Sequence, residues 1–176
     1  MRVLNVGGGV TEMPDKYAGW DVVMLDIDPA VKPDLCMDAR EIGSLDGETY
    51  DAVFCSHNLE HFYAHEVPAM LDGFRHVLKV GGFVEIHVPD LHTVAKGLVD
   101  HEPTDVAYEV DAGPVTYHDI LYGWNVAMSS GNPFYAHKCG FTAKSLGNAV
   151  CSAGFDKVDV WQGTCADLLA YGVKPC

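Results

Sequence analysis

Basic residues are scarce in this sequence, and they form no run. Lysine and arginine together number 11 against 25 aspartates and glutamates, so the formal net charge is −14 at pH 7. Nucleic-acid-binding proteins present a basic patch to phosphates, and anionic membrane surfaces attract clustered lysines and arginines. The sequence therefore argues against a polynucleotide substrate and against binding to a membrane surface.

Long apolar runs and paired cysteines are missing as well. No stretch approaches the roughly 20 apolar residues that a membrane span needs. Residues 1–6 lead into glycines without the apolar core of a secretory signal. The six cysteines include no Cys-x-x-Cys pair, so we expect no structural zinc site. Together these features favour a cytoplasmic protein with reduced cysteines.

What the sequence does contain is an alternation of short apolar runs with segments of helical period. Such alternation predicts parallel strands joined by crossover helices, and 176 residues suffice for one domain. Ligands of such sheets bind outside the carboxyl ends of the strands. The predicted strands are residues 3–6, 22–25, 34–37, 52–55, 83–88, 158–161 and 166–171, and the predicted helices run from Val67 to a stop at Gly81 and from an N-cap at Thr142 to Gly154.

Polar or glycine residues follow the first four predicted strands in order. Glycines 7–9 follow the first strand, where a backbone without Cβ atoms can approach a ligand, although a tight turn alone would explain them. Asp26 follows the second strand, as expected for a carboxylate that binds a ribose diol. A turn-capping aspartate is the alternative, and Asp28 before Pro29 fits that role better. Asp38 follows the third strand, and Ser56 with His57 follows the fourth.

Four stretches carry a resemblance to a known family: residues 3–9, residues 25–29, residues 50–53 leading into Leu59-Glu60-His61, and residues 77–82. In this combination the chain resembles the class I S-adenosylmethionine-dependent methyltransferases, in particular the methyltransferase type 11-like branch with the Leu-Glu-His signature. The resemblance covers residues 2–90 and 137–161. It implies a doubly wound, Rossmann-like sheet with a C-terminal antiparallel strand. It also implies one methyltransferase-like domain over residues 1–176, in which residues 90–137 cover the substrate.

The resemblance also implies S-adenosylmethionine as the cofactor and assigns residues to it. Two positions depart from the family pattern: Asn5 stands where an acidic residue is usual, and Thr11 stands where a third glycine is usual. Both changes affect the methionine end of the site. By the resemblance, Gly7 and Gly9 with Asn5 would bind the methionine part, Asp26 the ribose hydroxyls, Asp38 and the backbone of Ala39 the adenine, and Ser56 and His57 would lie beneath the sulfonium.

Methyl transfer from a sulfonium is an in-line displacement, so alignment of donor and acceptor supplies much of the rate. A general base assists when the acceptor carries a proton. The candidates are His57, Asp90 and His118, each of which also suits a structural polar role. We expect no metal site, because His61 and His65 stand four residues apart without the further ligands that zinc needs.

The function predicted from the sequence is methyl transfer to a small molecule or another acceptor that is not a nucleic acid. Two alternatives remain. A non-catalytic binding protein of the same fold would explain the change at Asn5. A nicotinamide-dependent oxidoreductase would share Gly7, Gly9 and Asp26, but its fingerprint needs a third glycine that the segment 13–19 does not offer.

The first crossover is short. Only residues 10–19 separate Gly9 from Trp20, and Pro14 interrupts them. A parallel crossover normally takes a dozen or more residues, usually with a helix. We therefore predict that the first helix is absent or reduced to a short irregular segment. One face of the sheet would then expose apolar surface, and a homodimer is one way to cover it.

Overall fold

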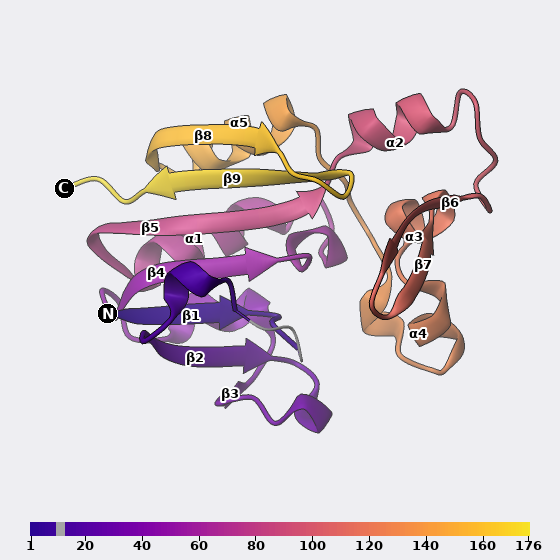
Figure 1. Cartoon of the computed structure of the whole chain (residues 1–176). Helices are drawn as coiled ribbons and strands as arrows, with labels where there is room; N and C mark the ends of the chain where they lie inside the picture. The colour runs from indigo at the N-terminus through magenta and orange to yellow at the C-terminus, as the bar shows by residue number, and fades with distance from the viewer. Residues whose placement is uncertain (10–12) are drawn as a thin grey trace.

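The computed structural model describes residues 1–9 and 13–176. Its centre is a seven-stranded sheet with the strand order β3-β2-β1-β4-β5-β9-β8 (Figure 1). The first five strands pair in parallel, and β9 runs antiparallel to both of its neighbours. The predicted doubly wound, mostly parallel sheet is therefore confirmed. The strands are β1 (Arg2–Val6), β2 (Asp21–Asp26), β3 (Leu35–Cys36), β4 (Tyr50–Ser56), β5 (Leu78–Pro89), β8 (Asp156–Gln162) and β9 (Asp167–Val173).

Helices cover one face of this sheet. Helix α1 (Val67–Val77), helix α5 (Ala143–Ser152) and the 3-10 segment η3 (Ala39–Ser44) pack there around the main apolar cluster. The predicted N-cap of α5 is confirmed, because the Thr142 side chain accepts a hydrogen bond from the Ser145 backbone in a capping box. The predicted stop of α1 at Gly81 is wrong. The helix ends at Val77 because Leu78 already pairs with Tyr50 as the first residue of β5.

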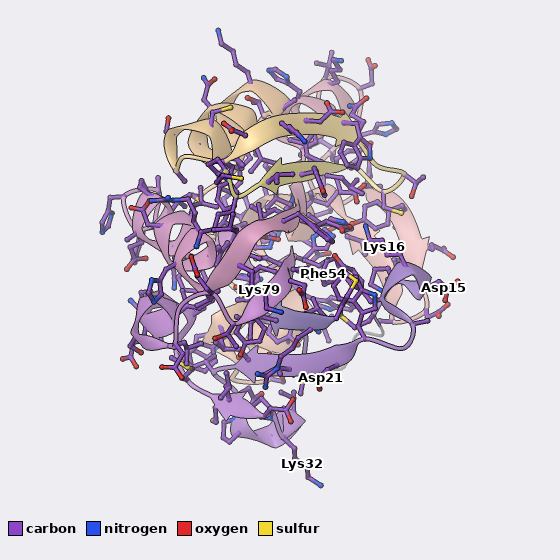
Figure 2. All side chains as sticks on the ribbon, turned by 90° about the vertical axis from the view of Figure 1, so that its left-hand side faces the viewer. Asp15, Lys16, Asp21, Lys32, Phe54 and Lys79 are labelled. Carbon is purple, nitrogen blue, oxygen red and sulfur yellow. The ribbon has the colours of Figure 1, made fainter. Side chains whose placement is uncertain are left out.

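The opposite face has no long helix among the described residues. The part of the first crossover that the structure describes, residues 13–20, contains only one 3-10 turn, η1 (Asp15–Tyr17). Within the described residues, this confirms the prediction that the first helix is absent or reduced to a short irregular segment. Thr11, the position where a third glycine is usual, lies outside the described residues. Viewed along the strands (Figure 2), the segment with Asp15 and Lys16 lies on one side of the sheet and the helices lie on the other.

The thin layer on this face is aromatic. Tyr17 packs against Trp20 and Phe54, with ring centroids 5.2 and 5.6 Å away. Beyond these rings the sheet is exposed at β2, as predicted for the region of the first two strands, and also at β8 near the other edge. The strand registers place Val22 and Trp161 on this face, and they are 37% and 44% exposed. The sheet therefore has a thick helical layer on one face and only a thin, partial aromatic layer on the other.

A buried carboxylate anchors the short crossover to the sheet. Glu85 on β5 is only 2% exposed. Its oxygens accept hydrogen bonds from the Tyr17 hydroxyl and the His87 ring, both at 2.9 Å, and it forms an ion pair with Lys16. Burial alone would raise the pKa of Glu85, but its contacts with His87, Lys16 and Tyr17 outweigh burial and lower the pKa to about 2.

We expect this network to make stability depend on acid pH. The pKa of Glu85 is lower in the folded chain than its ordinary value of 4.5, so its contribution is complete above pH 4.5 and is lost as the pH falls towards about 2. Full protonation would remove about 3 kcal/mol of unfolding free energy. Urea denaturation between pH 6 and pH 2.5 measures this loss. The Glu85→Gln variant should lack this part of the pH dependence, and an equal acid loss in variant and parent would contradict the assignment.

The segment between β5 and α5 forms a separate layer beyond the carboxyl ends of the parallel strands (Figure 1). It contains a two-stranded hairpin that the sequence pattern did not predict. Among the described residues, no helix has the length and apolar character required to cross a membrane. The elements of this segment are α2 (Leu91–Gly97), β6 (Val106–Val110), β7 (Gly113–Thr116), α3 (Tyr117–Tyr122), α4 (Asn125–Ser129) and η5 (Pro133–Tyr135); the remaining 3-10 turns are η2 (Pro29–Val31) and η4 (Leu59–His61).

Candidate active site

A pocket of about 860 Å³ opens between the carboxyl ends of the strands and the segment that follows β5. Its sheet side combines the glycine turn after β1, the end of β4 and the turn η4. Its other side is mostly aromatic and apolar, with few polar groups, which is typical of a small-molecule site. The sheet side contributes Gly7, Gly8, Gly9, Ser56, His57, Glu60 and His61, and the facing segment contributes chiefly Tyr108, Val115, Asp119, Trp124, Val126, Tyr135 and His137.

The glycine turn needs its glycines for space as well as for conformation. Gly7 and Gly9 have φ values of 66° and 52°, which glycine adopts at little cost. A Cβ atom at Gly7 would overlap the Asn58 side chain, and one at Gly8 would overlap the Asn5 side chain. A Cβ atom at Gly9, in contrast, would meet no atom of the described residues within 4 Å. The turn therefore packs tightly against two asparagines and leaves its last glycine free towards the pocket.

Asp26 braces this turn from the end of β2. Its Oδ2 accepts a hydrogen bond from the Gly9 backbone at 3.1 Å, and its Oδ1 accepts one from the Asp28 backbone at 2.9 Å. Asp28 itself caps the next turn through Ala30, as the capping alternative suggested. Asp26 is not itself in the pocket lining but is bonded to Gly9, which is. Among the described residues each of its oxygens accepts one hydrogen bond, which leaves lone pairs for a ligand.

The expected adenine-binding residues lie outside the pocket lining. Asp38 caps η3, and Arg40 binds its carboxylate through Nε at 3.0 Å and Nη2 at 2.6 Å. The hydrogen bonds from Arg40 outweigh burial and lower the pKa of Asp38. Ala39 is buried beside it. The structure therefore brings Gly7, Gly9, Ser56 and His57 together in the pocket lining. Asp38 and Ala39 follow β3 and are not part of that lining.

Of the three base candidates, only His57 lines the pocket. Its Nδ1 lies 3.5 Å from Glu60 Oε1. Burial lowers the pKa of His57, but the neighbouring carboxylate outweighs burial and the pKa is raised. Asp90 instead caps α2 and accepts three hydrogen bonds, from His92, Thr93 and Gln162. His118 packs against Tyr122, with ring centroids 5.0 Å apart.

Beside His57 lies a cluster of three side chains that no sequence pattern indicated. Glu60, His61 and His137 offer one oxygen or nitrogen atom each, and these atoms lie within 4.8 Å of one another. His61 therefore has two potential further ligands that the spacing of His61 and His65 does not indicate. His65 does not join the cluster but stacks on Tyr63 instead. In the sequence, Glu60 is recognisable only as part of the Leu-Glu-His signature, and no local pattern connects it with His137.

The cluster is strongly perturbed by burial. Glu60 is 1% exposed, and neither of its carboxylate oxygens has a hydrogen-bond partner among the residues that the structure describes. Burial raises its pKa, but the surrounding imidazoles outweigh burial and lower it. Burial lowers the pKa of His137, whose Nδ1 lies 3.0 Å from the Ile120 carbonyl oxygen and whose Nε2 lies 3.9 Å from Glu60 Oε1. The cluster therefore combines a buried carboxylate with two imidazole rings at the edge of the pocket.

The strand order and the pocket at the carboxyl ends define the Rossmann-like fold of a class I S-adenosylmethionine-dependent methyltransferase. The family model described as "Methyltransferase domain" matches residues 1–160, and the chain belongs to this family. The oxidoreductase alternative is thereby set aside. No curated protein sequence matches the chain.

Solved methyltransferase structures share this fold. An S-adenosylmethionine-dependent methyltransferase from Archaeoglobus fulgidus has 16% sequence identity and a TM-score of 0.64, over 98% of this chain and 86% of that one. The 1,6-didemethyltoxoflavin-N1-methyltransferase of Burkholderia thailandensis, solved with 1,6-didemethyltoxoflavin and S-adenosylhomocysteine, has 16% identity and a TM-score of 0.60, over 99% and 71% of the two chains. At these identities the likeness concerns the fold alone.

Proposed function

We propose that this chain is a cytoplasmic enzyme that transfers a methyl group from S-adenosylmethionine to a small-molecule acceptor. The observation that carries the proposal is the pocket itself, with a glycine turn on its sheet side and an aromatic wall facing it. The B. thailandensis neighbour was solved with a small aromatic acceptor, which supports the same substrate class. The net charge of −14 argues against a nucleic-acid or membrane acceptor, and six free cysteines fit a reducing compartment.

The residues around the glycine turn fit this cofactor. Asn5 and Asn58 each bury a side-chain oxygen that accepts no hydrogen bond from the described part of the chain, and both side chains pack against the turn. An ammonium donor would satisfy such an oxygen. When bound, the cofactor supplies an electrophilic methyl group on a sulfonium. In this proposal Asn5, Gly7 and Gly9 bind its methionine part, Asp26 the ribose, Asp38 and Ala39 the adenine, and Ser56 the region near the sulfonium.

The chain's own contribution to the reaction is positioning and proton removal. The segment 90–137 of the single domain excludes water and orients the acceptor against the sheet side. His57 is the preferred base, because its Nδ1 faces Glu60 and its Nε2 is left to take the acceptor's proton. Asp90, with three hydrogen bonds, and His118, outside the pocket lining, are weaker candidates.

We expect Asp26→Ala to weaken binding of S-adenosylhomocysteine at least tenfold. Hydrogen bonds to a charged group are worth about 1.5–3 kcal/mol each, and the variant also loses the brace to Gly9. Isothermal titration calorimetry measures the change, with Asp28→Asn as the control, because Asp28 is an exposed cap on Ala30. Equal affinity of Asp26→Ala and the parent would overturn the ribose assignment.

Methyl transfer itself separates an enzyme from a non-catalytic binding protein of this fold. Incubation of the purified chain with cell metabolite extracts and methyl-labelled S-adenosylmethionine should yield a labelled small molecule. Cofactor binding without transfer to any component of the extracts would favour the binding protein.

The proposal includes a homodimer across the exposed sheet face with Val22 and Trp161, which sedimentation at micromolar concentration would detect.

A further inference from the structure

We infer that Glu60, His61 and His137 form a binding site for a divalent transition-metal ion inside the acceptor pocket. The three side chains come from the turn η4 and from the segment that follows η5, and all three line the pocket. Their candidate ligand atoms lie within 4.8 Å of one another. Two imidazole nitrogens and one carboxylate oxygen are a donor set that Zn²⁺, Fe²⁺, Mn²⁺ and Co²⁺ accept.

The Glu60 carboxylate is the strongest sign that a cation belongs here. It is 1% exposed, and neither oxygen accepts a hydrogen bond from residues 1–9 or 13–176. A buried, unpaired carboxylate is costly unless a positive charge or hydrogen-bond donors compensate for it. Among the described residues, no lysine or arginine forms an ion pair with Glu60. Its nearest partners are the rings of His57 at 3.5 Å and His137 at 3.9 Å, which make no hydrogen bond with it and form an ion pair only when protonated.

The geometry of His137 points to the same conclusion. Its Nδ1 donates to the Ile120 carbonyl oxygen at 3.0 Å, so in the neutral ring Nε2 carries a lone pair. That lone pair faces Glu60 Oε1 across 3.9 Å, so two acceptors confront each other without a donor. A metal ion about 2.0–2.2 Å from each atom would bridge this gap. A backbone carbonyl behind a ligating histidine is the usual arrangement at metal sites.

His61 has a matching imbalance. Its Nδ1 lies 3.2 Å from the Ala136 carbonyl oxygen and its Nε2 lies 3.1 Å from the His57 carbonyl oxygen. A neutral imidazole has one N–H, so it can satisfy only one of these carbonyls, and the lone pair on its other nitrogen then faces a carbonyl oxygen. Metal binding would require the ring to turn this nitrogen from the carbonyl towards Glu60. Three protein ligands also leave coordination positions open to the pocket. If the proposed methyltransferase function holds, those positions would bind an oxygen of the acceptor.

The test is metal binding to the chelator-treated, full-length chain, without any acceptor. Titration with Co²⁺, followed by its visible absorption, and with Zn²⁺, followed by calorimetry, should give one equivalent per chain with nitrogen and oxygen ligation. Glu60→Gln and His137→Gln should each weaken Co²⁺ binding at least tenfold. His65→Gln is the matched control, because His65 is close in sequence but stacks on Tyr63 outside the cluster. Circular dichroism and thermal melting establish that each variant is folded.

Equal Co²⁺ affinity of His137→Gln and the His65→Gln control would overturn the inference, as would a cobalt spectrum dominated by thiolate ligation or the absence of a stoichiometric site. Should Glu60→Gln fail to fold, His137→Gln alone decides. S-adenosylhomocysteine binding to the metal-free chain is measured alongside. Retained cofactor binding without a metal site would reject the metal and leave the proposed function intact. Metal binding without cofactor binding would support the metal site and reject the proposed function.

Discussion

Replacing His57 by glutamine is expected to lower kcat on an identified acceptor by about 10²–10⁴-fold, the usual contribution of a general base. His57 is the one base candidate in the pocket lining, and it extends from the end of β4 with a left-handed backbone, φ 48°. Glutamine keeps the polarity of the side chain but cannot take a proton at neutral pH. Binding of S-adenosylhomocysteine should stay at the parental level, so the effect falls on turnover.

Steady-state kinetics with labelled S-adenosylmethionine provide the measurement. His118→Gln serves as the control, because His118 lies outside the pocket lining and packs against Tyr122 with the rings tilted. Asp90→Asn is a third variant, and we expect it to affect stability more than kcat. Full turnover in all three variants would show that the acceptor needs no base from this set.

Truncating Phe74 to alanine should cost about 3–5 kcal/mol of unfolding free energy, the largest stability effect predicted here. Phe74 is fully buried on α1, within the main cluster between the helices and the sheet. The contrast is Phe83→Ala on the other face. Phe83 is only partly buried and stacks on Tyr171, with ring centroids 5.2 Å apart. We expect a cost of about 1–2 kcal/mol there.

Urea denaturation of the two variants and the parent measures both costs, and an unchanged m-value would show that the denatured state is unaltered. Equal losses at Phe74 and Phe83 would mean that the two faces contribute alike. That result would contradict a core concentrated on the face covered by α1 and α5.

Local signals predicted much of the fold, because they act over a few residues. Thr142 caps α5 through a residue three positions away, and Pro68 suits the first turn of α1. The shortness of the first crossover likewise predicts from the sequence alone that no long helix fits there. The end of α1 could not be placed in this way. Leu78 continues the helical period but pairs with Tyr50 in the sheet, and that partner lies far away in the sequence.

The sequence by itself determined that polar residues follow the strands and so gather at one edge of the sheet, because parallel strands all end there. It thereby placed Gly7, Gly9, Ser56 and His57 in one pocket. Only the tertiary structure decided that the carbonyl-backed ring of His137 turns towards the unpartnered carboxylate of Glu60. No helical or strand period connects the two residues. Their approach depends on how the segment after β5 packs over the strand ends, and local sequence does not encode that packing.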